Sequence, residues 1–297
     1  MKKLIGCLLG AMLLLGGISL VGAQENSGTM SEAGISPPPK VLQIIREFTK
    51  PGKSGAIHEK SESGFVQAYA RAKWPSHYFA ATSITGKSRA LFFVGYDSYA
   101  SWEKDAMAQQ KNSGLSAALD RASMADGDLL SEMDTSLLRY DEEQSLRAPV
   151  DIAHMRYFEI SLYRVRAGHR KEWSDLVKLV KDGYDKVSDV HWAMYDADYG
   201  QEGAAYVVII PLKSAAEIDE SGSHDKQFRE ALGEDGMKKL SELESSAVEF
   251  YQTNLFQFAP AMSYPPDAWV KADPEFWKVK AAAKAPAKTE EKPAAKQ

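Results

Sequence analysis

The sequence predicts an α+β protein in which two copies of one β-α-β-β-α-β unit pack sheet to sheet. The first observation behind this prediction is an internal repeat. Five landmarks recur in the same order, at offsets of 109 to 116 residues: Gly52 and Gly168, His77 and His191, Ala90 and Ala205, Asp126 and Asp235, Leu130 and Leu240. The second is composition, because 44% hydrophobic and 26% charged residues in a chain of 297 indicate a globular protein.

Each copy begins with a strand, over residues 41–48 and 156–163, that ends at a glycine-containing turn. A helix is expected next, over 54–72 in the first copy and 169–186 in the second. In the second of these helices the apolar residues keep helical spacing on one face, which predicts that this face is buried: Trp173, Leu176, Leu179, Val180 and Tyr184.

Two further strands, a helical region and a closing strand complete each copy. Short glycine-containing links predict hairpins of 77–84 with 89–96 and of 190–196 with 204–210. The helical region is expected to break at Asp126-Gly127 and at Asp235-Gly236, before closing strands near 136–140 and 248–258. This order is that of the ferredoxin-like unit, whose sheet has helices on one face only. Two copies in one chain can therefore cover each other's open face.

The expected organisation has five parts: a signal peptide (1–23), a disordered spacer (24–40), repeat 1 (41–150), repeat 2 (151–265) and a C-terminal extension with an Ala/Lys/Pro-rich disordered tail (266–297). Lys2 and Lys3, an apolar stretch and small residues before Gln24 predict export to the periplasm or secretion. Two alternatives are an uncleaved membrane anchor and lipidation of Cys7. The second is weakened because the apolar region follows Cys7 instead of ending there.

Charge and cysteine content exclude several classes of function. Without residues 1–23 the chain has 34 basic and 41 acidic residues, and its last twenty carry +4, so the rest carries −11. Such an acidic body disfavours nucleic-acid binding, whereas the basic tail could touch an anionic surface. Cys7 is the only cysteine, so the processed chain has no disulfide, thiol nucleophile or cysteine-ligated metal.

The duplicated unit, with its Pro51-Gly52 and Ala167-Gly168 turns, resembles the dimeric α/β-barrel superfamily, here fused in tandem. That superfamily includes antibiotic-biosynthesis-monooxygenase-like and stress-responsive barrel proteins, and more narrowly the chain resembles secreted bacterial proteins built as two such repeats. The resemblance covers about residues 41–258 and implies a pseudo-dimeric α/β barrel. It implies no single activity, because this fold carries many chemistries.

Alternation along the first strand of each repeat predicts which residues could line a pocket. The apolar face, with Phe158 and Ile160, is expected to meet the helices. The mixed face, with Gln43, Tyr157 and Glu159, is then expected to point between the sheets. A carboxylate there would have a raised pKa unless paired, as a general base requires. The alternative is that Glu159 is hydrogen-bonded to tyrosines or lies near a rim.

Three further residues complete the predicted ligand site. His77 and His191 begin equivalent strands and could be polar pocket residues or an axial haem ligand, or simply surface histidines. Trp192 could stack on a flat ligand or belong to the core. The remaining histidines, which are His58, His154, His169 and His224, show no spacing typical of a metal cluster.

These observations favour an exported, non-catalytic protein that binds a small ligand or an envelope protein partner. No catalytic residue, metal ligand or cofactor is predicted, since the common catalytic and nucleotide-binding motifs are missing. The alternative, implied by the resemblance, is a cofactor-free monooxygenase-like or haem-handling barrel enzyme. The chain is expected to be a monomer with pseudo-two-fold symmetry or a homodimer, with no transmembrane anchor after processing. A cavity reaching Glu159 would favour a ligand, and a filled interior a structural or partner-binding role.

Overall fold

The computed structural model describes residues 35–278, so the predicted signal peptide and nearly all of the basic tail lie outside the described residues. Repeat 1 supplies four strands: β1 (Val41–Thr49), β2 (Tyr78–Ser83), β3 (Arg89–Tyr96) and β4 (Leu130–Leu146). Repeat 2 supplies the equivalent four: β5 (Tyr157–Val165), β6 (Trp192–Tyr199), β7 (Ala204–Leu212) and β8 (Val248–Phe258). Repeat 1 also supplies α1 (Ala56–Ala72), α2 (Tyr99–Lys111) and α3 (Ser113–Gly127), and repeat 2 supplies α4 (Arg170–Tyr184), α5 (Ala216–Asp219) and α6 (Ser221–Ala247).

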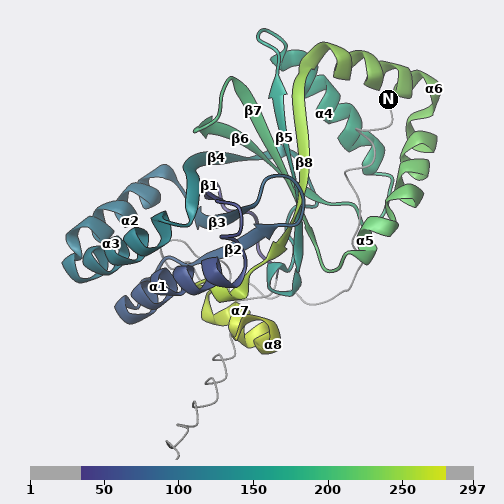
Figure 1. The fold of residues 1–297 in the computed structure, drawn as a ribbon. Coiled ribbons are helices and arrows are strands. Elements are labelled where there is room, and N and C mark those ends of the chain that lie inside the picture. Colours follow the sequence, from purple (N-terminus) through teal and green to yellow (C-terminus); the bar gives the residue numbers. More distant parts are fainter. Residues whose placement is uncertain (1–34, 279–297) are drawn as a thin grey trace, which may run out of the picture.

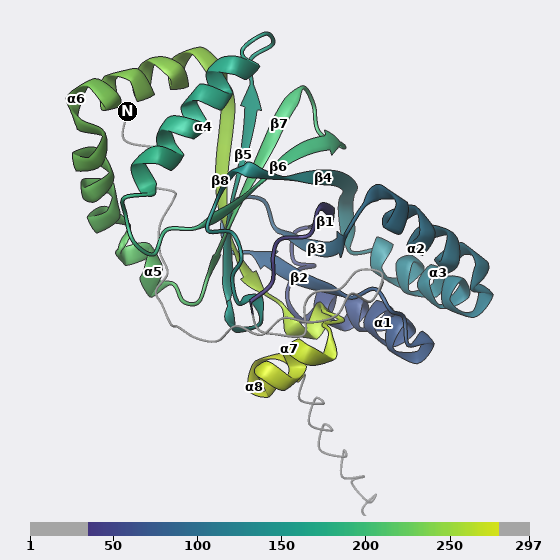
Figure 2. The same ribbon diagram turned by 180° about the vertical axis from the view of Figure 1, so that it is seen from behind.

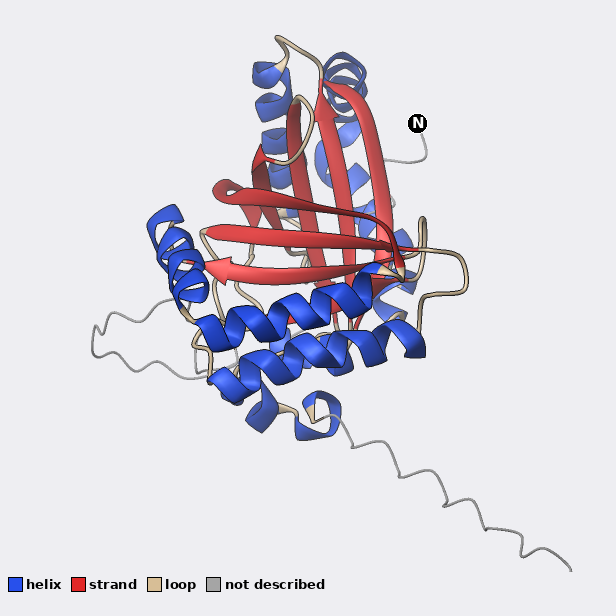
Figure 3. Ribbon diagram, turned by 60° about the vertical axis from the view of Figure 1, so that its left-hand side comes forward, coloured by secondary structure: helices blue, strands red, loops and turns tan. Residues whose placement is uncertain are grey.

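The eight strands form one closed antiparallel barrel in the order β1-β3-β2-β8-β5-β7-β6-β4. Each repeat keeps the same internal order, and two seams, β2 with β8 and β4 with β6, join the repeats. Figure 1 and the reverse view in Figure 2 place α1–α3 on one side of the barrel and α4 and α6 on the other. Figure 3 shows the strands as one continuous curved sheet with the helices outside. The predicted α+β fold of two ferredoxin-like repeats is therefore confirmed, with the sheets joined at their edges as well as facing each other.

Two helix breaks and one strand differ from the sequence predictions. Asp126-Gly127 ends α3, and the break lies at Asn112, whose side-chain Oδ1 accepts a 3.0 Å hydrogen bond from the Leu115 N–H and caps α3. In α6 the bend is at Gly233, with φ 65°, not at Asp235-Gly236. The predicted strand at 136–140 is only the middle of β4, which is 17 residues long because it pairs with β1 and also crosses the seam to β6.

Apolar side chains from all eight strands pack inside one part of the barrel, which corrects the predicted orientation. Phe158, Ile160 and Leu162 point inward, where Phe158 packs with Phe79, Phe93 and Phe258 at ring-centroid distances of 4.6–5.6 Å. The mixed face of β5 lies under the helices instead. A narrow barrel interior holds little water, so apolar side chains fill it. The outer face is covered by helices that themselves carry polar groups.

The segment after repeat 2 closes one end of the barrel. It contains the 3-10 turn η2 (Pro260–Met262) and the short helices α7 (Asp267–Ala272) and α8 (Pro274–Trp277), at the lower end in Figure 1. Trp269 and Trp277 join the interior cluster, and the Trp277 indole N–H donates a 2.8 Å hydrogen bond to the carbonyl of Ala153, in the 3-10 turn η1 (Ile152–His154). The end of the predicted spacer also contacts the barrel, since Ser36 forms a β-bridge to Val150.

No helix within residues 35–278 is long and apolar enough to span a membrane.

Candidate functional site

The structure separates the six predicted site residues. Gln43 lies on the outer face of β1, opposite Val94, and Tyr157 and Glu159 lie on the outer face of β5. The prediction that these three point between the sheets is wrong, because the apolar face of each strand takes the interior. Trp192 is buried in the core between α4, α6 and the sheet, with its indole N–H donating to the carbonyl of Gln144 at 2.8 Å.

Glu159 is a partly buried residue whose carboxyl oxygen Oε1 is shielded from solvent, and no charged side chain within residues 35–278 shifts its pKa. It sits between Ile210 of β7 and Leu255 of β8, and its Oε1 has no hydrogen-bond partner among the described residues. Burial alone raises the pKa of Glu159 to about 8. The predicted tyrosine hydrogen bonds are not made by this oxygen.

Neither predicted histidine is placed to hold haem. His191 is buried and its Nε2 is 2.9 Å from the carbonyl oxygen of Pro211, so that nitrogen is occupied as a donor. The His77 ring stacks on Tyr264 with centroids 4.7 Å apart. Burial lowers the pKa of both imidazoles. Because neither ring lines a cavity large enough for a porphyrin, we derive no haem chemistry from these residues.

A cavity of about 300 Å³ opens between the two sheets at the end of the barrel opposite α7 and α8. We call it the barrel mouth. Its floor is apolar and comes from both repeats: Ile44, Leu91, Leu138, Ile160, Leu162, Val207 and Phe256. Its rim is polar: Arg46, Lys87, Arg89, Asp134, Ser136, Gln201, Gln252 and Asn254. Phe48 completes the lining. The cavity is open but does not reach Glu159.

The rim carries unbalanced positive charge. Arg46 forms an ion pair with Asp134, whereas Lys87 and Arg89 have no carboxylate partner among the described residues. The Arg89 guanidinium lies 4.9 Å from the centre of the Phe256 ring. Burial, followed by the nearby charge of Arg46, lowers the pKa of Arg89, and the charge of Asp134 offsets only part of this shift. An anion bound beside Arg89 would offset both the cost of burying its charge and its repulsion from Arg46.

A second polar site lies in repeat 1, buried between β1, α1 and α3. We call Glu47, His58, Glu62 and Asp126 the buried tetrad; each is between 1% and 6% exposed. The His58 Nε2 is 3.2 Å from Glu47 Oε2, 3.5 Å from Asp126 Oδ1 and 3.8 Å from Glu62 Oε1.

The charges of the buried tetrad strongly perturb one another. Burial by itself lowers the pKa of His58, but the Asp126 and Glu47 carboxylates outweigh it and raise that pKa to about 10. Burial, followed by the charges of Glu47 and Asp126, raises the pKa of Glu62 to about 9. Burial also raises the pKa of Glu47. Strongly shifted groups gathered in one place are typical of functional sites.

Sequence reasoning missed the buried tetrad because its members lie far apart in the chain. The histidines alone show no metal spacing, and the carboxylates come from three elements. One signal was present, since His58 and Glu62 are four residues apart and so share a helix face. Strand alternation gives a second signal, since Glu47 shares a face of β1 with Gln43, and this face lies next to the helices.

Comparisons with known proteins show similarity of fold only. No protein-family model matches the chain, and no curated protein is similar to it in sequence. A candidate monooxygenase of Fusobacterium nucleatum aligns with a TM-score of 0.49 at 10% identity, over 74% of this chain and 93% of its own. An anthrone oxidase-like protein aligns with a TM-score of 0.48 at 13% identity, over 74% of this chain and 92% of its own. A chlorite dismutase variant from Candidatus Nitrospira defluvii aligns with a TM-score of 0.43 at 8% identity, over 78% of this chain and 95% of its own.

Proposed function

We propose that this protein binds a small amphipathic anion, such as a carboxylate or sulfonate with an apolar body, in the barrel mouth. The observation that carries the proposal is the joint geometry of this cavity, an apolar floor beneath a rim on which Lys87 and Arg89 lack acidic partners. Its volume of about 300 Å³ lies at the small end of ligand pockets. Both repeats contribute to its lining, so the duplication itself creates the site.

The lining favours binding over catalysis. Asp134 is its one carboxylate and is already paired with Arg46. The residues around the cavity include no histidine, cysteine or tyrosine, the side chains that most often act as nucleophile or general base. The oxygenase and haem-handling alternatives therefore rest on the resemblance. Export to the periplasm remains part of the proposal through the predicted signal peptide.

The test compares two probes that differ in charge. We expect anilinonaphthalene sulfonate, an aromatic anion, to bind the purified protein with one site per chain, and its uncharged analogue N-phenyl-1-naphthylamine to bind more weakly. Arg89→Gln should weaken binding of the anion about tenfold or more, as expected for the loss of a buried charge-assisted contact, and should barely change binding of the neutral probe. Fluorescence titration measures both affinities.

The matched control is Arg71→Gln, which removes a guanidinium from the exposed surface of α1, where its hydrogen bond within residues 35–278 is to Gln67. This variant should bind both probes like the unmodified protein. Equal losses in the two variants would show that only overall charge attracts the anion. Absence of saturable binding in the folded protein would refute the proposed function.

A further inference from the structure

The buried tetrad has the dimensions of a metal site. One ligand atom from each of Glu47, His58, Glu62 and Asp126 lies within 4.8 Å of the other three. Ligand atoms that are each about 2.1 Å from one ion lie roughly 3.4 Å apart in a tetrahedron; in an octahedron, neighbouring ligands lie about 3.0 Å apart and opposite ones about 4.2 Å. The spacings from His58 Nε2, 3.2 to 3.8 Å, fall within this range, and small side-chain adjustments would close the rest.

Hydrogen bonding within the protein leaves the buried tetrad incomplete. A single N–H at His58 Nε2 faces three carboxylates, and it is closest to Glu47. Glu62 Oε1 and both carboxylate oxygens of Asp126 make no well-aligned hydrogen bond among the described residues, although these side chains are only 2% and 1% exposed and Asp126 lies close enough to His58 and Glu62 to raise the pKa of both. Buried carboxylate oxygens without partners are costly, and a cation at their centre would satisfy all of them.

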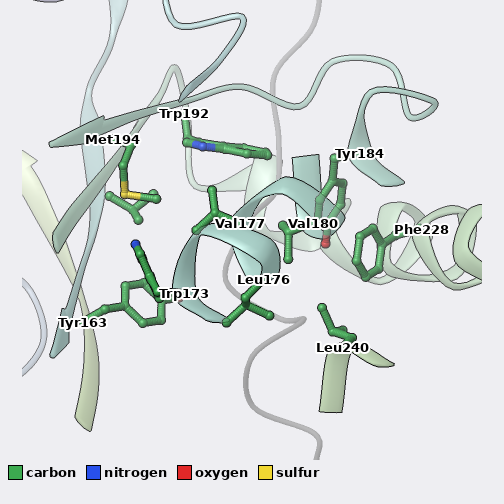
Figure 4. Close-up of a pocket in the computed structure, with 11 residues that line it drawn as sticks. Tyr163, Trp173, Leu176, Val177, Val180, Tyr184, Trp192, Met194, Phe228 and Leu240 are labelled. Atoms are coloured by element: carbon green, nitrogen blue, oxygen red, sulfur yellow. The ribbon is translucent and has the colours of Figure 1, made fainter. Parts of the chain in front are cut away.

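The equivalent place in repeat 2 shows that the fold does not require these residues. Glu47 is the seventh residue of β1, and Tyr163 is the seventh residue of β5. Around Tyr163, Trp173 and Val177 of α4 and Leu240 of α6 enclose an apolar cavity of about 50 Å³ (Figure 4). Repeat 1 thus places four ionisable groups where repeat 2 places an apolar core. A purely structural explanation does not account for that difference, since apolar side chains fill the same space in repeat 2.

We infer that the buried tetrad binds one first-row divalent transition-metal ion, such as Zn²⁺, Mn²⁺ or Fe²⁺, as a closed centre that ties α1 and α3 to β1. One imidazole nitrogen among carboxylate oxygens, without any thiolate, suits these ions better than Ca²⁺ or Mg²⁺, which prefer oxygen ligands alone. The site has four protein ligands and is shielded from solvent, which is typical of structural centres. This role is separate from ligand binding at the barrel mouth.

Local packing supports the site and offers access to it. Gly64 lets α1 approach α3 closely, because a Cβ there would lie 3.3 Å from the Cβ of Ala122. His58 belongs to the first turn of α1, which begins after Gly55 without a side-chain cap. An uncapped turn opens more readily than a capped one, so this turn provides a route for the ion.

The experiment uses the untagged protein, stripped with a chelator and titrated with Zn²⁺, Mn²⁺, Co²⁺ or Ca²⁺ alone. We expect one transition-metal ion per chain, a rise in melting temperature of several degrees, and visible absorption bands from bound Co²⁺. Ca²⁺ should bind much more weakly. Glu62→Gln, which keeps the shape of a ligand but removes its charge, should weaken binding about 100-fold or more, given that outer partners alone contribute 10–100-fold.

Asp126→Asn is a second variant from a different helix, so that failure of one variant to fold does not leave the inference without a test. Glu159→Gln is the matched control, since it replaces a partly buried carboxyl outside the buried tetrad with the same amide, and it should bind the ion normally. Binding that survives in both tetrad variants would place the ion on surface histidines and overturn the inference. Failure of the stripped protein to bind any transition metal would overturn it as well. Neither result would bear on probe binding at the barrel mouth.

Discussion

Glu159→Gln is expected to stabilise the folded protein by about 2–4 kcal/mol at pH 9, and at pH 5 to leave stability unchanged or lower it by up to about 2 kcal/mol. The carboxyl is buried beside Ile210 and Leu255, and its pKa is raised from 4.5 to about 8 by burial. Below pH 4.5 it is protonated in both the folded and the unfolded chain and costs nothing. Between pH 4.5 and 8 the unfolded chain releases the proton and the folded chain retains it, so the free energy of unfolding falls as the pH rises.

The size of this effect follows from the shift. The rise of the Glu159 pKa from 4.5 to about 8 lowers the free energy of unfolding by at most about 5 kcal/mol above pH 8. Glutamine is neutral at every pH and removes this cost, but its amide is left without a partner, which takes back about 1–3 kcal/mol. Urea unfolding at pH 5, 7 and 9 measures the difference between variant and unmodified protein, which cancels the titration of other groups.

Glu249→Gln is the control, because Glu249 is exposed on β8 of the same repeat. Its unfolding free energy should follow that of the unmodified protein at all three pH values. If Glu159→Gln behaves in the same way, the carboxyl is ionised in the folded state and is solvated more fully than its position indicates.

Much of the fold could be predicted because the local sequence patterns that specify its strands, turns and helices occur twice. The Gly52 and Gly168 turns end equivalent strands, and the apolar stripe of the helix at Trp173 and Leu176 identifies its buried face. Repetition of one βαββαβ order then restricts the architecture, since each sheet must cover its open face. The seams between β2 and β8 and between β4 and β6 could not be predicted, because they depend on strands separated by more than about forty residues in the sequence.

The orientation of the strands was the main failure, and it displaced the predicted site. Alternation shows that Phe158 and Glu159 lie on opposite faces of β5, but not which face is inside a closed barrel. The prediction assumed that a polar pocket lies between sheets and apolar faces meet helices. In this protein the apolar faces point into the barrel, so Glu47 and Glu159 both lie under helices. Only Glu47 meets other ionisable groups there, because repeat 1 supplies them and repeat 2 does not.

The β6–β7 hairpin provides the second large effect, through Gly200. This residue has φ 82°, and a Cβ there would lie 2.1 Å from the carbonyl oxygen of Thr135 on β4. Its own carbonyl accepts hydrogen bonds from Ser136 Oγ at 3.1 Å and from Arg46 at 3.5 Å. The glycine therefore lets the hairpin of repeat 2 rest against β4 of repeat 1 at the rim of the barrel mouth.

We expect Gly200→Ala to destabilise the protein by about 3 kcal/mol or more, and Gly203→Ala by only about 1 kcal/mol. Both positions have positive φ, at 82° and 70°, and so share the left-handed backbone strain of roughly 1–2 kcal/mol. At Gly203 the nearest atom to a Cβ is in the flexible Arg164 side chain, 3.8 Å away, so no overlap is added. At Gly200 the overlap is with backbone, and overpacking of this kind costs about 1–3 kcal/mol more.

The two variants also separate stability from ligand binding. Gly200→Ala must push the hairpin away from β4, which removes the contact between its carbonyl and Arg46 and moves Gln201 at the rim. We therefore expect weaker binding of anilinonaphthalene sulfonate to Gly200→Ala at a temperature where the variant remains folded, and unchanged binding to Gly203→Ala. Equal unfolding free energies for the two variants would show that the hairpin does not rest on β4. In that case the β4–β6 seam would not close the barrel mouth as described.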